Sequence, residues 1–506
     1  MSLDLFESWT ALQLLVLAVL FAIAMKSRSS KSKKYPPRMG VWTIVQDLVL
    51  HKDKVPHRTF TCWAKTYGPI YSVRTGATSA VVVLSSSKAA RQAMTEKHSS
   101  ITAKKLTTAL QVLSLDKTMV ALSDYGKDHR LLKKLMVTHL LGTAPQRNNV
   151  KMREEVVQKL IGSIYSALNH CSADGRDAVN MSKILLDHVF SFALNQVIGR
   201  DVKPLYVEEL GSEIVSVQDM YHLIIGDPAT AALEINWRDF VPFVNRWFPN
   251  KKLHAMLKEV TRRRAAVVKA LIRQERELLS SGKEAKGYLD MLLKEGEGLR
   301  EKQLETAIWE PIIESTTTTH VTLVWAMFEL AKNPHVQDRL FKEIEKVCGN
   351  KCVEEGDLSN LPYLKAVFYE TIRRHSPLPL VPLRVVHEDV EIDGYHVPAG
   401  WQILINIYGA NNYEGEWENP EEWKPERQLV FGEEDDLQRT MTFGAGKRLC
   451  AGWTQAVSIA SLALARISQN FMWEMPAGHE EDYETIINTG THKLRPLMTI
   501  LTPRNV

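Results

Sequence analysis

One cysteine near the carboxyl end of the chain lies in a setting suited to binding a metal through a thiolate. Cys450 belongs to the segment FGAGKRLCAG, residues 443–452, with glycines before and after it. Glycines allow a tight loop whose backbone amides can point at the sulfur and tune the electronics of a bound metal. A thiolate needs a cation, a metal or oriented dipoles to stay ionised, whereas a buried, inert cysteine needs none of these. The segment alone leaves both interpretations open.

A run of four threonines, residues 316–319, is a second segment whose side chains could do chemistry. β-branched side chains crowd the preceding turn of a helix, and threonine hydroxyls can bond back to backbone carbonyls. We therefore expect a functional bend or groove in the helix that carries them. A threonine-rich packing seam is the alternative.

A pair of opposite charges, Glu370 and Arg373, has the spacing that places both on one face of a helix. Exposed pairs of this kind are common and contribute only about 0–1 kcal/mol. Their position changes the interpretation, because the pair precedes the cysteine segment and Arg427 falls between the two.

The segments around these residues carry both strand and helix patterns. Residues 71–76 and 80–84 are rich in β-branched and aromatic residues and are joined by turn residues, which predicts a hairpin. Residues 390–408 are a second β-rich stretch, with glycine and proline where strands should reverse. Apolar residues recur with helical spacing over residues 260–279 and 304–331, and the latter segment carries the threonines. We predict a mainly α-helical fold with small β-sheets (α+β).

The composition excludes several classes of protein. The 506 residues, 45% hydrophobic and 24% charged, are typical of a globular chain rather than a disordered or fibrous one. The net charge of +4 is small and no basic stripe interleaved with aromatic residues occurs, so we expect no nucleic acid partner. Five scattered cysteines do not resemble a secreted disulfide framework. Cys348 and Cys352 lie close together but lack the second ligand pair of a zinc site.

An apolar run near the amino terminus predicts a membrane anchor. Residues 9–25 are apolar apart from Thr10 and Gln13, near the lower length limit for crossing a bilayer. Basic residues follow the run and acidic residues precede it, so the rest of the chain should face the cytosol. A cleaved signal peptide is the alternative, but it requires the basic stretch before the apolar run. We predict an anchor with its basic flank over residues 1–34 and one catalytic domain over residues 35–506.

The cysteine segment resembles the haem-binding loop of the cytochrome P450 family. Residues 443–452 match the pattern Phe-x-x-Gly-x-Arg-x-Cys-x-Gly at every fixed position, and this pattern is highly specific. The resemblance implies a cytochrome P450 fold and a haem b group whose iron takes the Cys450 thiolate as its axial ligand. It also implies that Phe443, Gly444 and Arg448 belong to the haem-binding loop, with Arg448 at a propionate.

The same resemblance gives roles to residues elsewhere in the chain. Arg384 stands where the family has a propionate-binding arginine. Arg130 and Lys133 stand where the family usually has residues over the haem edge, and a solvated basic face is the alternative for both. The buried structural cluster that fixes the cysteine loop in the family would here consist of Glu370, Arg373 and Arg427.

The threonine run resembles the oxygen-activating turn of the family, but it departs from the usual pattern. Aligned through the residues that follow, Thr318 takes the place of the threonine that guides protons, and Thr317 takes the place of an acid. A carboxylate can relay protons from water, and loss of a general acid or base commonly costs on the order of 10²–10⁴ in rate. Glu314 and His320 are the candidates to supply the missing group.

Several longer stretches resemble one branch of the family, the plant ent-kaurene oxidases. They include residues 57–71, 236–240, 361–370 and 395–400, and the resemblance covers roughly residues 57–503. It implies stepwise oxidation of a diterpene methyl group through alcohol and aldehyde to acid, in gibberellin or related diterpenoid biosynthesis. Electrons would come from NADPH through the flavins of a membrane-bound NADPH-cytochrome P450 reductase. The expected location is the endoplasmic reticulum membrane, with the plastid outer envelope as the alternative.

Substrate contacts and reaction type are less specific expectations. We expect contacts from residues 104–113, the threonine helix, residues 378–383 and the segment near Leu494, where the individual candidates are Val381, Leu383 and Ile312. The proline- and glycine-rich hinge that usually follows the anchor is replaced by YPPRMG at residues 35–40. Three alternatives remain: a hydroxylase of another labdane-related diterpene, a non-oxidative haem-thiolate isomerase or dehydratase, and a haem protein without turnover.

Overall fold

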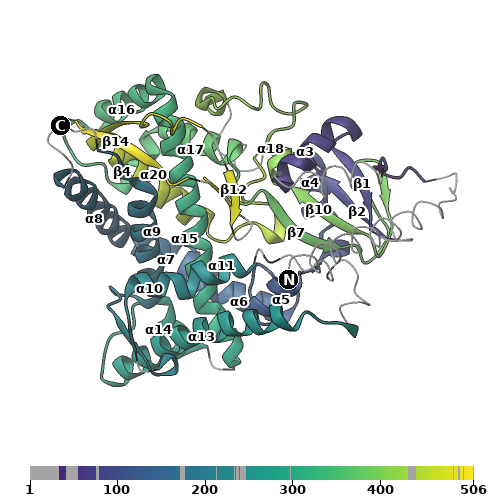
Figure 1. Ribbon diagram of the computed structural model, residues 1–506, viewed down its shortest axis with the longest axis horizontal. Helices are drawn as coiled ribbons and strands as arrows, with labels where there is room; N and C mark the ends of the chain where they lie inside the picture. Colours follow the sequence, from purple (N-terminus) through teal and green to yellow (C-terminus); the bar gives the residue numbers. More distant parts are fainter. Residues whose placement is uncertain are drawn as a thin grey trace, which may run out of the picture. The chain divides into compact units, whose positions relative to one another are not determined.

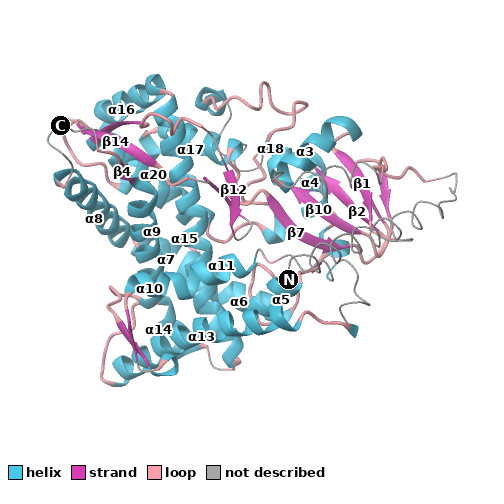
Figure 2. Cartoon of the chain, in the orientation of Figure 1, coloured by secondary structure: helices cyan, strands magenta, loops and turns pink. Residues whose placement is uncertain are grey.

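The computed structural model describes two compact units, which are treated separately. The first comprises Met1–Lys105 and Leu380–Glu418, and the second comprises Leu106–Pro379 and Asn419–Val506. Figure 1 traces the chain in sequence colours, and Figure 2 marks its helices and strands. The described residues are 33–40, 55–75, 79–170, 177–211, 213–232, 234, 239, 247–296, 298–430, 440–481, 484–487, 490–493 and 495–504.

A five-stranded sheet of order β1-β2-β10-β7-β3 forms the body of the first unit. The predicted hairpin is confirmed, because β1 (Ile70–Arg74) pairs antiparallel with β2 (Ala80–Leu84). β10 (Gln402–Asn406) then runs parallel to β2 and antiparallel to β7 (Leu380–Val385). All five residues of β10 are buried, as its run of apolar residues requires of a strand covered on both faces. The remaining strand, β3 (Ala103–Lys104), pairs with β7.

Short helices and a second hairpin complete the first unit. The hairpin joins β8 (Val390–Ile392) to β9 (Tyr395–Val397) through Asp393 and Gly394, whose φ angles of 47° and 79° suit a tight two-residue turn. α3 packs on the sheet through Trp63, and Ser86 caps α4 by accepting a bond from the Ala89 amide. The described helices of this unit are α3 (Pro56–Tyr67), α4 (Ser87–Met94), α18 (Ile407–Asn411) and the 3-10 helix η2 (His98–Ile101).

The second unit is mainly helical, as Figure 2 shows by its colours. Within the part of this unit that the structure describes, the α-helices are α5 (Thr108–Leu113), α6 (Lys127–Met136), α7 (Thr143–Asn148), α8 (Val150–Asn169), α9 (Met181–Ile198), α10 (Val217–Tyr221), α11 (Asp227–Ala232), α13 (Lys251–Ser280), α14 (Tyr288–Glu295), α15 (Glu301–Lys332), α16 (Pro334–Cys348), α17 (Pro362–Arg374) and α20 (Trp453–Asn470). Two π-helical segments, η3 (Val137–Leu141) and η5 (His222–Gly226), extend α6 and α10, and the 3-10 segments are η4 (Glu208–Leu210), η7 (Glu355–Asn360), η8 (Pro425–Val430) and η9 (Gly446–Arg448).

Small sheets accompany these helices, which confirms the predicted mixture of many helices and little strand. β11 (Phe471–Glu474), β14 (Met498–Pro503) and β4 (Val179–Asn180) form one sheet. Two further antiparallel pairs join β5 (Leu205–Val207) to β6 (Glu213–Val215) and β12 (Glu484–Ile487) to β13 (Gly490–Lys493).

α15 is the central helix of the second unit and contributes to two hydrophobic clusters. Residues 307–313 of α15 supply most of its contribution to one cluster, and residues 321–331 supply its contribution to the other. The polar segment 314–320, which contains the threonines, lies between them. Figure 1 shows α15 running through this unit beside α9, its most extensive partner. The predicted helices 260–279 and 304–331 are confirmed within α13 and α15, which start earlier. Asn250 caps α13 by accepting a bond from the Leu253 amide, and at the start of α15 the Gln303 side chain accepts one from the Arg300 amide.

The predicted anchor, residues 9–25, lies outside the described residues. Among the residues that are described, no helix has the length and apolar character needed to cross a membrane. The division into an anchor over residues 1–34 and a catalytic domain over residues 35–506 therefore stays a prediction.

Candidate active site around Cys450

The cysteine loop, residues 443–452, folds back on itself before α20 begins. Gly444 and Gly446 have φ angles of 73° and 61°, a conformation that strains residues with a side chain. The Cys450 amide donates to the Phe443 carbonyl at 2.9 Å, and the Leu449 amide donates to the Gly446 carbonyl at 3.0 Å. Phe443 packs its ring against the hydrophobic core. The loop therefore holds Cys450 by its own backbone bonds.

The thiol of Cys450 is exposed to solvent, yet nearby protein atoms displace much of its water. Burial is the largest cause of a rise in its pKa to about 11, and the negative charge of Glu314 adds to the rise. A hydrogen bond from the Gly452 amide and the positive charge of Lys133 act in the opposite direction. At neutral pH the thiol is thus protonated in the protein alone, and a bound metal ion is needed to make it a thiolate.

The donor set around Cys450 fits a haem iron. Within the described part of the chain, no group of three or more His, Cys, Asp or Glu residues could hold a metal ion. One accessible thiol suits a metal that brings its other ligands with it, as iron does in a porphyrin ring. The Gly452 amide that points at the sulfur is the kind of outer contact that tunes such a ligand.

Lys133 of α6 is bonded to the cysteine loop itself. Its ammonium group donates to the carbonyls of Lys447 at 3.0 Å and Leu449 at 3.4 Å. Burial lowers the pKa of Lys133, as does the charge of Arg448, whereas Cys450 raises it. The lysine therefore braces the loop on the side that precedes the cysteine.

Arg448 is held by the segment that precedes α6. Its guanidinium donates to the carbonyls of Val120 at 3.3 Å and Ser123 at 2.8 Å, and it lies 3.0 Å from Nδ1 of His129. Arg130 is exposed, with its guanidinium carbon 5.8 Å from the centre of the Tyr125 ring. The expected contacts of Arg448, Arg130 and Lys133 with haem propionates stay predictions.

The threonine segment stays α-helical, and its hydroxyl groups bond back to the helix. The side chains of Thr316, Thr317 and Thr318 donate to the carbonyls four residues earlier at 2.7, 2.8 and 2.8 Å. The expected bend is not visible as a break in α15. Glu314 and Thr318 are both exposed and one turn apart, so they share a face of α15, and the negative charge of Glu314 acts on the Cys450 thiol.

His320 belongs to a different face of α15. Its Nε2 lies 3.0 Å from the carbonyl of Ser182 in α9. Burial lowers the pKa of His320 to about 4, so the ring is neutral at physiological pH. His320 is therefore bonded to α9 and neutral, and the role of Glu314 as the proton source stays a prediction.

Glu370, Arg373 and Arg427 meet in one buried cluster. Arg373 forms two bonds with Glu370, at 2.8 and 2.9 Å, and Arg427 forms one at 2.8 Å. The side chains of Glu370 and Arg373 are fully buried, and that of Arg427 is 11% exposed. The helix that carries Glu370 and Arg373, α17, also contacts the segment just before the cysteine loop. The Thr442 hydroxyl donates to the Ile372 carbonyl at 3.1 Å.

The remaining predicted residues are distributed between the two units. Arg384 is buried in β7 of the first unit, opposite Lys104 and Ile403. Its contact with the haem stays a prediction, as do the substrate contacts of Val381 and Leu383 in the same strand. Ile312 is fully buried in the helical core of the second unit, and Leu494 lies outside the described residues.

Sequence reasoning missed three adjacent residues of α15. The Trp309 indole donates to the Ile224 carbonyl at 2.7 Å, Glu310 accepts two backbone amides, and Pro311 lies inside the helix. A single acid and a proline within the apolar stretch 307–313 were the signals that could have pointed to this position.

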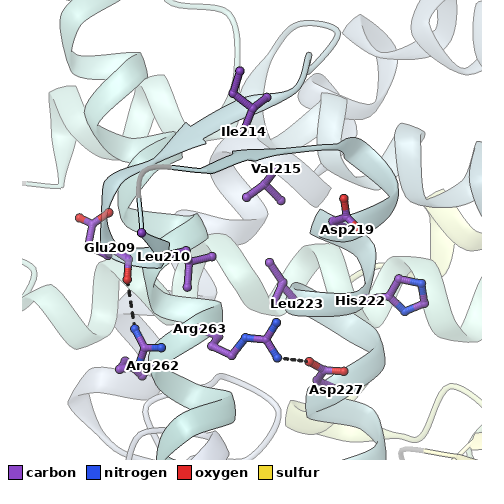
Figure 3. Close-up of a pocket in the computed structure, with 11 residues that line it drawn as sticks. Glu209, Leu210, Ile214, Val215, Asp219, His222, Leu223, Asp227, Arg262 and Arg263 are labelled. Carbon is purple, nitrogen blue, oxygen red and sulfur yellow. Dashed lines mark hydrogen bonds and ion pairs between the residues drawn. The ribbon is translucent and has the colours of Figure 1, made fainter.

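A separate cavity of about 750 Å³ opens between α13 and the chain from η4 to α11 (Figure 3). Its two arginines already have partners: Arg263 lies 3.3 Å from Asp227, and Arg262 donates to the Glu209 carbonyl at 3.1 Å. No residue of the cysteine loop lines it, and its charged walls suit a hydrocarbon poorly. The lining residues are Glu209, Leu210, Gly211, Ile214, Val215, Asp219, His222, Leu223, Asp227, Arg262 and Arg263.

Comparison with known proteins identifies relatives along nearly the whole chain. The Cytochrome P450 family profile matches residues 36–496. An ent-kaurene oxidase from Salvia miltiorrhiza is 42% identical, and the match covers 95% of this chain and 92% of the relative. Ent-kaurene oxidase 2 from Oryza sativa subsp. japonica is 44% identical, and the match covers 94% of this chain and 92% of that relative. Ent-sandaracopimaradiene 3-hydroxylase, also from Oryza sativa subsp. japonica, is 39% identical, and the match covers 93% of this chain and 91% of that relative.

Solved structures share the fold. A zebra fish cytochrome P450 determined with progesterone superimposes with a TM-score of 0.72 at 22% identity, covering 89% of this chain and all of the other. A second zebra fish structure, determined with abiraterone, gives a TM-score of 0.71 at 21% identity. The TM-scores establish a common fold, and sequence identity at this level carries no information on the substrate.

Proposed function

Because this chain belongs to the cytochrome P450 family, we propose that it oxidises a methyl group of a tetracyclic diterpene hydrocarbon, with ent-kaurene as the first candidate. The chain is an oxidoreductase, a haem-thiolate monooxygenase similar to ent-kaurene oxidases over most of its length.

The placement of Cys450 carries the proposal. Its accessible sulfur lies within electrostatic range of the one exposed carboxylate on the central segment 314–320 of α15. A haem held by a cysteine thiolate supplies, when bound, the power to insert oxygen into an unactivated C–H bond, which no protein side chain does alone. The chain's own task is then to hold the sulfur, orient the substrate and deliver protons.

We assign the first task to the loop and its braces. Lys133 fixes the carbonyls of residues 447 and 449, and the Gly452 amide donates to the sulfur, which stabilises negative charge there. Arg448 would face a propionate while it stays bonded to the segment before α6. The buried cluster around Glu370 holds α17, to which Thr442 is bonded.

We assign proton delivery to Glu314 and Thr318. The carboxylate of Glu314 is exposed and can exchange protons with water, and the Thr318 hydroxyl lies one turn further along the same face. Thr317 occupies the position of the family's acid, but its hydroxyl does not ionise at physiological pH. Like the Thr318 hydroxyl, it donates to the carbonyl four residues earlier. Glu314 therefore takes over the role of that acid.

The relatives support a diterpene substrate without settling the oxidised carbon. Those named ent-kaurene oxidase are 42% and 44% identical, and one named a 3-hydroxylase of ent-sandaracopimaradiene is 39% identical. Small changes in an apolar pocket can redirect an oxidation. The alternative is therefore a hydroxylase of another labdane-related diterpene.

We further propose that electrons come from NADPH through the flavins of a membrane-bound reductase. The apolar run of residues 9–25 and the basic residues after it support an anchor with the catalytic domain in the cytosol. A substrate that partitions into lipid fits an enzyme of the endoplasmic reticulum or plastid envelope, and gibberellin biosynthesis would use the resulting acid.

Product analysis tests the proposal. Microsomes that contain this protein and a cytochrome P450 reductase are fed ent-kaurene with and without NADPH, beside matched microsomes carrying Cys450→Ser. We expect kaurenoic acid only with NADPH and only with the cysteine present. Conversion without NADPH would establish an isomerase or dehydratase instead. Absence of product in protein with its thiolate-bound haem intact would refute the ent-kaurene assignment.

A further inference from the structure

Glu310 is a buried carboxylate that holds two neighbouring backbone amides. Its side chain lies in α15 and the residue is 1% exposed. One oxygen accepts the Val120 amide at 2.7 Å, and the other accepts the Ala121 amide at 2.6 Å. A carboxylate is costly to bury unless its oxygens are hydrogen-bonded, and bonds to an ionised acceptor are the stronger kind. Glu310 therefore ties α15 firmly to the peptide units of residues 120 and 121.

The same peptide segment holds the cysteine loop from its other side. The Val120 carbonyl accepts from Arg448 at 3.3 Å, and the Ser123 carbonyl accepts from the second nitrogen of that guanidinium at 2.8 Å. Val120 is thus bonded through its N–H to α15 and through its C=O to the loop that carries Cys450. A short path of hydrogen bonds joins Glu310 to Arg448.

The segment is strained where it begins. Leu115, Asp116 and Lys117 are consecutive non-glycine residues with φ angles of 49°, 61° and 64°. Residues with a side chain are strained in this region, and such conformations persist only where the surrounding structure imposes them. Lys117 also pairs with Asp124 at 2.9 Å, which closes residues 117–124 into a loop. We call residues 115–125 the clamped segment.

Two other side chains of α15 also hold backbone carbonyls of neighbouring segments, one of them through an arginine. Glu305 pairs with Arg264 at 2.9 Å, and Arg264 donates to the Leu113 carbonyl at 2.8 Å. Trp309 holds the Ile224 carbonyl in η5. Glu310 differs from both, because its segment is the one that reaches Arg448.

We propose that Glu310 is a positioning residue for the oxidation site, which fixes the clamped segment and, through Arg448, the cysteine loop. The inference rests on the proposed function only in assigning the oxidation to Cys450. Glu310 itself does not touch the sulfur. Glu310 fixes the carbonyls that hold the Arg448 side chain. It thereby fixes the position of the cysteine loop relative to the face of α15 that carries Glu314 and Thr318.

Amide hydrogen exchange of the full-length, haem-bound protein tests this path without any substrate. Glu310→Gln keeps the shape but turns one acceptor into an NH₂ group that faces an amide donor, and Glu310→Asp keeps the charge on a shorter side chain. Glu343→Gln is the matched control, because Glu343 also accepts two adjacent amides, those of Tyr363 at 2.8 Å and Leu364 at 3.0 Å.

We expect Glu310→Gln to accelerate exchange at least about 10-fold in the clamped segment and also in residues 443–452. Haem should dissociate faster from this variant, and Glu310→Asp should restore part of the protection. Glu343→Gln should accelerate exchange near residues 362–366 and leave the cysteine loop unchanged.

Two outcomes would overturn the proposal. If exchange became faster in the clamped segment but stayed unchanged in residues 443–452, Glu310 would fix only the clamped segment and not the cysteine loop. Uniformly faster exchange that includes α8 in both Glu310 variants would show a general stabilising role. Because exchange and haem release need no diterpene, a negative result with ent-kaurene leaves this test intact, and failure here leaves the product assay intact.

Discussion

Glu314 in α15 and Cys450 before α20 interact electrostatically. Burial raises the pKa of the Cys450 thiol to about 11, and the negative charge of Glu314 contributes to that rise. The charge that opposes ionisation of the ligand is therefore carried by the same carboxylate to which we assign proton delivery. Lys133 and the Gly452 amide oppose this effect, so the sulfur lies between groups of opposite influence.

The first prediction concerns the thiol in protein freed of haem. Alkylation of Cys450, followed by peptide mass spectrometry, should be slow at neutral pH and rise with a midpoint near pH 11. Glu314→Gln removes the negative charge, so the midpoint should fall. Glu301→Gln, an exposed acid at the start of the same helix, serves as the control and should not shift it. If alkylation of the unmutated protein rose with a midpoint at about pH 8.5, as for an ordinary cysteine, the prediction would be contradicted.

The second prediction separates two neighbouring threonines. Thr318→Ala removes the hydroxyl on the exposed face shared with Glu314, and product formation should fall by roughly 10²-fold while NADPH consumption continues. Thr317→Ala removes a hydroxyl that is likewise bonded to the carbonyl four residues earlier, yet it should have a much smaller effect. The measurement is product formed per NADPH consumed. Equal losses in both variants would contradict a special role for Thr318.

The third prediction concerns the buried cluster. Glu370→Gln leaves Arg373 and Arg427 with an uncompensated buried charge, so the free energy of unfolding should fall by about 3–5 kcal/mol. Urea unfolding followed by circular dichroism measures the change. Glu259→Gln breaks a pair with Arg262 that has the same spacing but is solvent-exposed, and it should leave the unfolding curve nearly unchanged. Similar curves for the two variants would contradict a buried cluster.

The fourth prediction is a dependence of stability on pH. Burial lowers the pKa of His320 to about 4, so the folded protein binds this proton less readily than the unfolded chain does. Stability should therefore decline as pH falls from about 6.5 toward about 4, by on the order of 3 kcal/mol from this residue. His320→Gln should flatten that part of the pH profile of the unfolding free energy. His335→Gln, which changes an exposed histidine, should leave the profile as it is.

Local features of the fold and site could be predicted because neighbouring residues encode them. The hairpin of β1 and β2 follows from two β-rich runs and the turn residues between them, and α15 follows from apolar periodicity. Pro311 lies inside α15, where a proline usually breaks a helix. The helix continues because packing on both of its sides outweighs the loss of one backbone bond. The family was identified from the spacing of the cysteine segment, and the comparisons confirm it.

By itself, the sequence determined the residues that bear the chemistry. The glycines of residues 443–452 set the turn, and the match of this segment to the family's haem-binding pattern singled out Cys450. Only the tertiary structure decided the partners of those residues. Glu310 meets Val120 across 190 positions of the chain, and His320 faces α9 rather than Thr318. The physical reason is that such bonds depend on which helix faces pack together, and the packing is set by the whole core rather than by adjacent residues.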